Sequence, residues 1–276
     1  MNSPIPDFLF ITVVYNNFED TEKFCESLRV QDRSTQFSLK CVIVDNSTDS
    51  VTSAKLASLA QTYQFVSVLR PDKNVGYFGG LNYALERCDC SKCSCVVVCN
   101  NDLEFAVDFC KSFIETKLSN DTFVVCPNVM TLDGFPQNPH VLRPLSRIAK
   151  LRIDLYYSHY YVAALLKITK RAILRTTPHG FWRNKPTSSC FVHMGIGACY
   201  LLLPQFFAHF AKLHYPFFLY GEEAFLSAQV HAGGGRLYYC STLNILHKEG
   251  GTLSKIPSRV NYEYARSGYC TYRKLY

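Results

Sequence analysis

A short apolar run that ends in polar residues is the first place in this chain where chemistry is expected. The run is Val96-Val97-Val98-Cys99, and the triplet Asn100-Asn101-Asp102 follows it. Because neither face alternates with polar residues, the run predicts a buried strand of a parallel sheet. The carboxyl end of such a strand borders the crevice where α/β sheets bind ligands, and a carboxylate there suits a divalent cation carrying phosphate oxygens. The alternative is an ordinary turn, which Asn and Asp also favour.

Two neighbouring glutamates form a second group that could do chemistry. Glu222 and Glu223 follow the aromatic run Phe217-Phe218-Leu219-Tyr220 and are expected at the start of a helix. Crowded or partly buried carboxylates have raised pKa values, which suits a general base near neutral pH. The alternative is an acidic helix N-terminus that the helix dipole favours without any catalytic role.

The first hundred residues alternate between strand and helix patterns, and this order would position the polar groups. Strands are expected at 8–14, 41–44 and 66–69, and helices at about 18–31 and 51–63. Such an order predicts a parallel, right-handed α/β sheet. Tyr15, Asp45 and Asp102 each follow one strand or end it, so all three should face one crevice. Independent turns explain that convergence poorly.

A glycine-rich segment begins the third expected helix. Asn74, Gly76 and Asn82 lie in this segment. Its glycines let the backbone approach a ligand closely, and the helix N-terminus favours an anion such as pyrophosphate. The spacing matches neither the dinucleotide fingerprint nor the P-loop, so this segment alone is weak support for a nucleotide site.

The charge of this globular chain is unevenly distributed. The 276 residues are 48% hydrophobic and carry a formal net charge of +7, and the segment 143–175 accounts for all of that imbalance. The segment predicts one or two helices with tyrosines between basic flanks, which suits an anionic membrane surface. A solvated helical insertion is the alternative. No nucleic-acid partner is expected, because the acidic sites would repel phosphates in the absence of metal.

Targeting signals and cysteines bear on the compartment. The N-terminus lacks the basic start and apolar core of a secretory signal, and no apolar run approaches the roughly 18 residues of a membrane span. We therefore expect a cytoplasmic protein, with peripheral contact at the inner face of the membrane through the basic segment. Most of the thirteen cysteines should then be small buried hydrophobes. Zinc is an alternative for the closely spaced thiols of Cys88, Cys90, Cys93 and Cys95.

Taken in order, the motifs resemble family 2 glycosyltransferases of the GT-A fold. They are an apolar strand with Tyr-Asn, Val-Asp-Asn-Ser-x-x-Asp, Asn-x-Gly-x-x-Gly-Gly-x-Asn, and an apolar strand with Asn-Asn-Asp. Three later segments, 195–202, 217–223 and 243–252, are also similar to the family. The resemblance covers about residues 8–255. The nearest branch is the rhamnosyltransferase-like and galactofuranosyltransferase-like one, which builds bacterial surface polysaccharides.

The resemblance implies a fold and a reaction. The fold would be a GT-A-type α/β domain over 1–255, with a Rossmann-like, mostly parallel sheet flanked by helices. A basic helical insertion would occupy about 143–175, and a helical tail 256–276. The reaction would be inverting transfer of a sugar from a nucleotide-sugar donor, a UDP-sugar first and dTDP-rhamnose next, to a saccharide or lipid-linked saccharide acceptor. Two alternatives stay open: a nucleotidyltransferase that makes sugar nucleotides, and a non-catalytic nucleotide- or saccharide-binding module.

The resemblance also implies a role for particular residues. Asp102 and His247 would hold Mg²⁺ or Mn²⁺, although a histidine in such a strand is also read as a core residue. Glu223 would be the general base, with Glu222 in reserve. The residues that would bind the donor are Thr12, Tyr15, Asp45, Asn74, Gly76, Asn82 and Asn101. The residues on the acceptor side would be Gly197, Ala198 and Trp182, the last with an ordinary loop anchor as its alternative role.

The chain departs from the family pattern at three positions. Asn100 stands where the family often has its first acid, and Glu223 stands where Asp is usual. Phe225 replaces an acid that commonly follows the glutamate pair. The last departure bears on how an acceptor would be recognised.

Overall fold

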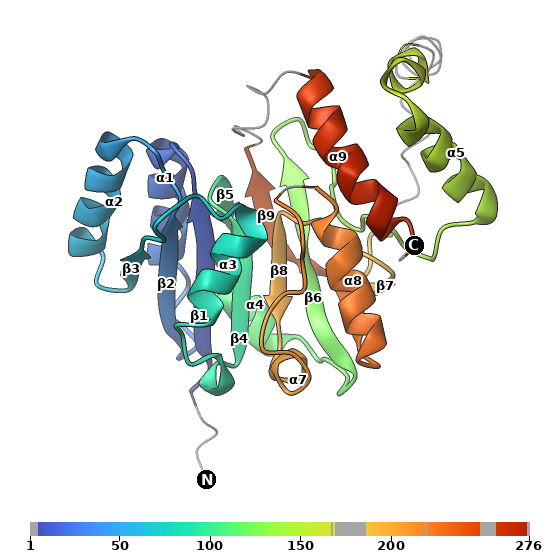
Figure 1. Ribbon diagram of the computed structural model, residues 1–276. Coiled ribbons are helices and arrows are strands. Elements are labelled where there is room, and N and C mark those ends of the chain that lie inside the picture. Colours follow the sequence, from blue (N-terminus) through green and yellow to red (C-terminus); the bar gives the residue numbers. More distant parts are fainter. Residues whose placement is uncertain (1–4, 167, 169–185, 219, 249–257, 275–276) are drawn as a thin grey trace.

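The computed structural model describes residues 5–166, 168, 186–218, 220–248 and 258–274. Within these residues the strands are β1 Asp7–Val14, β2 Ser38–Asp45, β3 Val66–Leu69, β4 Cys95–Asn100, β5 Leu103–Phe105, β6 Thr122–Thr131, β7 Cys190–Val192, β8 Cys199–Leu202 and β9 Arg236–His247. They form one sheet in the order β3-β2-β1-β4-β8-β6-β9-β5, and β7 pairs with the free side of β9 over part of its length (Figure 1). The sheet is therefore continuous from the first strand to the last.

The N-terminal half of the sheet is parallel, as the sequence predicts. β1 pairs in parallel with β2 and with β4, and β2 pairs in parallel with β3. The connecting helices are α1 Phe18–Arg29, α2 Ser50–Thr62 and α3 Tyr77–Leu85. The expected strand and helix positions in this half are confirmed to within a few residues.

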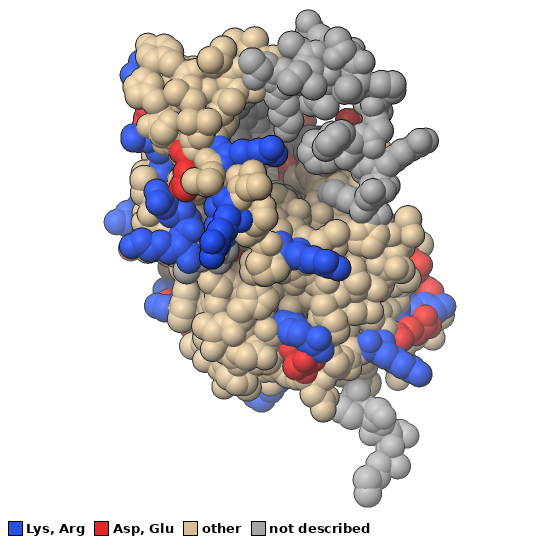
Figure 2. Space-filling model, turned by 90° about the vertical axis from the view of Figure 1, so that its right-hand side faces the viewer, with Lys and Arg blue, Asp and Glu red and all other residues tan. Residues whose placement is uncertain are grey.

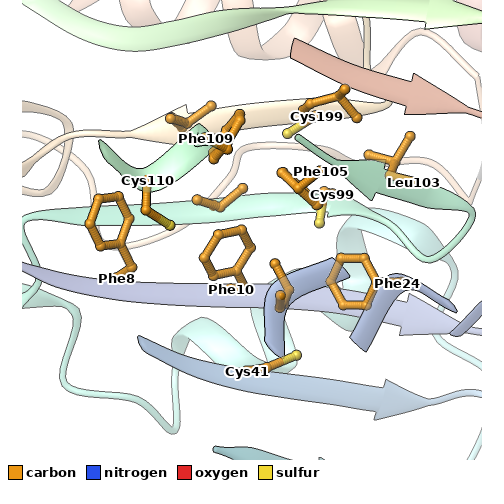
Figure 3. Packing of buried hydrophobic residues seen from close by; sticks show 14 of the residues in the cluster. Phe8, Phe10, Phe24, Cys41, Cys99, Leu103, Phe105, Phe109, Cys110 and Cys199 are labelled. Carbon is orange, nitrogen blue, oxygen red and sulfur yellow. The ribbon is translucent and has the colours of Figure 1, made fainter. Parts of the chain in front are cut away.

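Both faces of the sheet are covered by helices, which explains why β1 and β4 contain almost no polar residues. Phe8 and Phe10 of β1 point into one core with α1, α2 and α4 (Phe109–Glu115). Leu9 and Ile11 point into the other core with α3, α7 (Pro204–Phe207) and α8 (Glu222–Ala232). Figure 3 shows the first core, where the ring centroids of Phe10 and Phe105 lie 5.2 Å apart.

The C-terminal half of the sheet is mixed. β8 runs antiparallel to β4 and β6, while β6 and β9 are parallel. The short strand β5 pairs antiparallel with β9, so that Leu103 lies opposite His247. These pairings bring the residues after β4 into contact with the end of β9, far along the chain.

Two helices lie beyond the sheet on the C-terminal side. α5 Arg147–Ser158 belongs to the basic segment, and residues 160–166 are also helical. α9 Ser258–Tyr272 packs against α5, with Tyr157 and Tyr269 stacked at 4.5 Å between ring centroids. Among the described residues, no helix combines the length and the apolar character that crossing a membrane requires.

The cysteines are mostly buried, as expected. Ten of the thirteen are buried and only Cys270 is exposed. The loop with Cys88, Cys90 and Cys93 lies at the amino end of β4, opposite to Asp102. Burial raises the pKa of Cys90 to about 12 and of Cys93 to about 11, which favours protonated thiols. In the described part of the chain no three His, Cys, Asp or Glu side chains gather as a metal site.

Candidate functional site

The carboxyl ends of three parallel strands meet at one edge of the sheet. The register places Val14 beside Asp45 and Val13 beside Asn100. The N-terminus of α3 joins this edge, because Asn46 Nδ2 donates a hydrogen bond of 3.0 Å to the Gly76 carbonyl. The polar residues that the sequence places after β1, β2 and β4 therefore border one region, together with the glycine-rich helix start.

Asp45 is a buried acid at this edge. It is only 2% exposed, Ser47 N donates to its Oδ1 at 2.9 Å, and Arg70 Nη1 lies 3.7 Å from its Oδ2. Arg70 follows β3 directly and was not among the residues predicted from the sequence. Its position after a strand of the same parallel sheet was the signal that could have identified it.

Two further side chains at this edge have buried oxygens without a partner in the described residues. They are Thr12 Oγ1 and Asn46 Oδ1. Thr12 lies on β1, between β2 and β4, and is fully buried. A buried polar atom without a hydrogen bond costs free energy, so such atoms are often satisfied by a ligand or water. Tyr15 is half-buried one residue beyond the strand.

The residues of the glycine-rich segment at α3 differ in their contacts. Gly76 has φ +78° and stands so close to the next loop that an added Cβ would lie 2.7 Å from Phe218 O. Asn74 Oδ1 accepts from Gly76 N at 2.9 Å and fixes this turn. In contrast, both polar atoms of the Asn82 side chain bond to the backbone of Leu213. Nδ2 donates to Leu213 O and Oδ1 accepts from Leu213 N, at 2.9 Å each. These two hydrogen bonds hold the loop before α8 against α3.

Asn101 is tied to the start of α1. Its Nδ2 donates to Asn17 O at 3.1 Å and to Thr21 Oγ1 at 2.9 Å. These bonds fix the backbone between β4 and β5, and thereby the direction of the Asp102 side chain that follows.

Asp102 and His247 come together, although they are far apart in the sequence. The Nε2 of His247 lies 3.2 Å from Asp102 Oδ1, and the residues are only 9% and 6% exposed. The pairing of β5 with β9 holds them, and Lys248 N donates to Asp102 O at 3.1 Å. Asp102 Oδ1 is buried and takes part in no hydrogen bond within the described residues.

Gln137 decides which nitrogen of His247 carries the proton. Its Oε1 lies 2.7 Å from His247 Nδ1, and an amide oxygen only accepts. When Nδ1 donates to Gln137, Nε2 is the ring nitrogen that faces the Asp102 carboxylate, and a ring with a single proton would present its lone pair there. Two electron-rich atoms that face each other require a cation, which is either a proton or a metal ion. Sequence reasoning missed Gln137, because its loop carries no motif.

The Asp102–His247 pair fits a divalent cation. Neighbouring ligands of an octahedral Mg²⁺ lie about 3 Å apart, because each is about 2.1 Å from the ion. The separation of 3.2 Å between the two side-chain atoms agrees with this spacing. In the described residues no third His, Cys, Asp or Glu completes a cluster. Such a two-ligand set suits an ion that keeps waters and phosphate oxygens as its other ligands.

The glutamate pair begins α8, as expected, after an unusual turn. Tyr220 and Gly221 both have left-handed backbone conformations, with φ 71° and 97°. That conformation is costly for a tyrosine, and such strain is concentrated at functional sites. Tyr220 N donates to Glu222 Oε1 at 3.1 Å, which couples the turn to the first glutamate.

The two glutamates have different surroundings. Glu222 is 9% exposed, and burial, together with the charge of Glu223, raises its pKa to about 8. Glu223 is half-buried, and its Oε1 accepts from Gly197 N at 3.1 Å. Tyr77 of α3 donates its hydroxyl proton to Gly197 O at 3.2 Å. Glu222 is thus disposed to stay protonated at neutral pH, while Glu223 is held against the loop before β8.

The loop before β8 joins the glutamates to the end of β4. Asn100 N donates to Ala198 O at 2.9 Å, so Gly197 and Ala198 lie between the Asn-Asn-Asp triplet and Glu223. The structure therefore brings together the expected metal, base and Gly-Ala residues. Trp182 lies outside the described residues.

A parallel α/β half followed by a mixed half, with helices on both faces of the sheet, is a fold like that of GT-A glycosyltransferases. Residues 9–185 match the family model described as "Glycosyl transferase family 2". The chain belongs to this family. A search of curated proteins found no match.

Three solved structures illustrate the similarity of the fold. GalNAc-T7 with UDP, GalNAc and Mn²⁺ has a TM-score of 0.62, over 98% of this chain and 48% of that chain. Mannosyltransferase PcManGT from Pyrobaculum calidifontis, with GDP-Man and Mn²⁺, has 0.56, over 93% and 59%. S. aureus TarS has 0.55, over 88% and 36%. Each is 14% identical, so the likeness concerns the fold, and this chain spans between about a third and three fifths of their lengths.

Proposed function

We propose that the chain is a metal-dependent, inverting glycosyltransferase that moves a sugar from a nucleoside diphosphate donor to a saccharide acceptor. The observation that carries this proposal is the buried pair of Asp102 Oδ1 and His247 Nε2, which lie 3.2 Å apart at the carboxyl edge of the sheet. A UDP-sugar is the favoured donor and dTDP-rhamnose the next. The motifs favour the rhamnosyltransferase-like and galactofuranosyltransferase-like branch, and hence cell-surface polysaccharide synthesis at the cytoplasmic face of the membrane.

The donor would lie along the carboxyl edge of the parallel strands. Thr12, Tyr15 and Asp45 bind the nucleoside, with the unpaired Thr12 hydroxyl available to it. Asn74 and Gly76 shape the N-terminus of α3, whose free N–H groups favour the diphosphate. Asn101 fixes the backbone that presents Asp102. Asp102 and His247 would hold Mg²⁺ or Mn²⁺, and the bound ion would supply positive charge against the diphosphate.

Glu223 is the general base in this proposal. It takes the proton of the acceptor hydroxyl while that oxygen attacks the anomeric carbon and the bond to the diphosphate oxygen breaks. One displacement inverts the configuration at that carbon. Glu222 stays protonated at neutral pH and so does not compete for the proton, in keeping with its raised pKa. Gly197 and Ala198 border the acceptor side. Residues 1–255 would form this catalytic domain, with 256–276 as its helical tail.

Nucleotide binding tests the site. We expect UDP or dTDP, but not AMP, to raise the melting temperature in the presence of Mn²⁺, since a ligand at 100 times its dissociation constant adds about 2.7 kcal/mol. Asp102→Asn should remove the dependence on Mn²⁺. Asp108→Asn, an exposed acid before α4, is the matched control and should keep it. No shift with UDP, dTDP, GDP or CDP, with or without Mn²⁺, would overturn the proposal.

Turnover separates an enzyme from its two alternatives. Glu223→Gln should lose transfer but keep the nucleotide-dependent shift, because the amide cannot accept the proton. A binding module would show the shift without transfer from any donor in the wild type. A nucleotidyltransferase would instead release pyrophosphate from a nucleoside triphosphate and a sugar phosphate.

A further inference from the structure

Helix α5 has two apolar sides, and within the described residues only one of them packs on the rest of the protein. Ile153 and Tyr157 contact the cluster formed by Met194, Ala224, Tyr269 and Tyr272, next to α8 and α9. The other side carries Ile148, Leu151 and Leu155, which are 65%, 66% and 52% exposed. Their spacing of three and four residues places them in one line along the helix.

A second helical run, which begins at residue 160 after the extended backbone of His159, also carries exposed apolar side chains. Tyr161, Leu165 and Ile168 are 66%, 61% and 64% exposed, again at spacings of four and three. We call these six residues, from Ile148 to Ile168, the outer stripe. Single exposed apolar side chains are normal on a protein surface, but six large ones within one short segment mark an interaction surface.

The surroundings of the outer stripe are basic. Residues 143–166 contain four cations and one acid. Arg147 and Arg152 are exposed and, at roughly 100° per residue, lie on opposite sides of the stripe. The acid, Asp154, is turned inward, because Tyr269 donates to it at 2.7 Å and Arg273 lies 3.4 Å away. Figure 2 looks at this side of the molecule and shows Lys and Arg side chains gathered in its upper left part.

We propose that the outer stripe binds the surface of an anionic lipid bilayer. Its apolar side chains would enter the boundary between headgroups and acyl chains, and Arg147 and Arg152 would bind the phosphates beside them. A second copy of this chain is a poorer partner, because it presents the same cations around the same stripe, and like charges oppose such a contact. The occupant that complements an apolar line between arginines is a negatively charged membrane interface.

The inner side of α5 connects this surface to the candidate site. Tyr157 packs against the cluster that contains Ala224 of α8, the residue after Glu223. A bilayer bound to the outer stripe would therefore lie on the same side of the molecule as the glutamates. An acceptor carried by a lipid would then approach Glu223 from the membrane. This step rests on the proposed function.

Vesicle sedimentation with the full chain tests the surface. We expect binding to phosphatidylcholine vesicles with 30% phosphatidylglycerol, and a steep decrease with salt. Leu151→Ser with Leu155→Ser should weaken binding about tenfold or more. Arg147→Gln with Arg152→Gln should weaken it about 30-fold, from roughly fivefold for each cation near an anionic surface. Pure phosphatidylcholine should bind weakly and without dependence on the arginines.

Matched controls use the α1 and α2 side of the molecule. Val51→Ser removes an apolar side chain that is 62% exposed, and Lys23→Gln with Lys55→Gln removes two exposed cations. Both controls should bind vesicles like the wild type. The melting temperature and the shift with UDP and Mn²⁺ should be unchanged in the stripe variants, because none of the substituted residues lies in the donor site.

Three results would overturn the proposal. They are a wild-type chain that does not sediment with anionic vesicles, stripe variants that bind as well as the controls, and self-association without lipid that the stripe variants abolish. The last result would make the stripe a subunit interface. Missing nucleotide shifts in the wild type would instead refute the proposed function and leave the vesicle result standing.

Discussion

Replacing Gly197 by alanine tests whether Glu223 is positioned by the loop before β8. Gly197 N donates to Glu223 Oε1 at 3.1 Å, and an added Cβ would lie 2.8 Å from the same oxygen. The Glu223 Cδ would be 3.3 Å away, so the whole carboxylate has to move by several tenths of an ångström. Gly197 does not have a positive φ, so its backbone conformation suits alanine.

The size of the effect follows from the displaced carboxylate. Crowding in a packed region costs about 1–3 kcal/mol of unfolding free energy. A misplacement that approaches 1 Å at a reacting group can cost about 100-fold in rate, so we expect kcat/KM to fall about 10- to 100-fold. Affinity for the nucleotide should stay within about twofold (about 0.4 kcal/mol), because the hydrogen bonds of Gly197 go to Tyr77 and Glu223 and not to the donor residues.

A double-mutant cycle with Glu223→Ala isolates the contact. The alanine at 223 removes the atoms that an added Cβ at 197 would meet. In that background Gly197→Ala should change the unfolding free energy by less than about 0.5 kcal/mol, as measured by urea denaturation. Equal destabilisation in both backgrounds would refute the reasoning, because the effect would then arise elsewhere in the loop. Full activity of Gly197→Ala would refute the role of Glu223.

Two more predictions concern the neighbours of the site. Gln137→Ala should weaken Mn²⁺ binding about 10- to 100-fold, because His247 Nδ1 loses the partner that fixes the ring tautomer. Gln137→Glu should restore much of the Mn²⁺ affinity. Equal Mn²⁺ affinities of the wild type and Gln137→Ala in a titration would contradict this prediction. Because burial raises the pKa of Glu222 from 4.5 to about 8, the stability it contributes is full below about pH 4.5 and is lost as pH rises towards 8. Glu222→Gln should therefore unfold at a similar temperature at pH 5 but be more stable at pH 8.5, by on the order of a few kcal/mol; the wild-type pH slope persisting in the variant would contradict it.

The parallel half of the fold could be predicted from the sequence because its signals are local. The apolar runs at 8–14 and 96–99 are buried on both faces, and polar residues stop them at the edge where ligands bind. Local signals of the same kind also identified Asp45 and Asp102, because each acid lies at or directly after the end of an apolar run. Parallel strands bring their carboxyl ends together whatever the details of packing, so the proximity of these acids followed from strand order alone.

The remaining features depend on contacts between distant segments. Gln137 reaches His247 through a loop without a motif, and nothing local indicates that contact. Asn82 stands at a position that resembles the family motif, but its amide forms hydrogen bonds with Leu213. Only the packing of the loop before α8 determines this contact. The basic segment was recognised from its charge, whereas the exposure of Leu151 and Leu155 required the structure, because an apolar helix face is equally suited to a core.

The central claim is that Asp102 and His247 hold a divalent cation against a nucleoside diphosphate. The most direct measurement is the anomalous diffraction of Mn²⁺ in crystals grown with UDP. We predict one strong peak that is coordinated by Asp102 Oδ1, His247 Nε2 and diphosphate oxygens, and that disappears in Asp102→Asn. Bound UDP with no Mn²⁺ at this pair, or with Mn²⁺ held by other residues, would contradict the account.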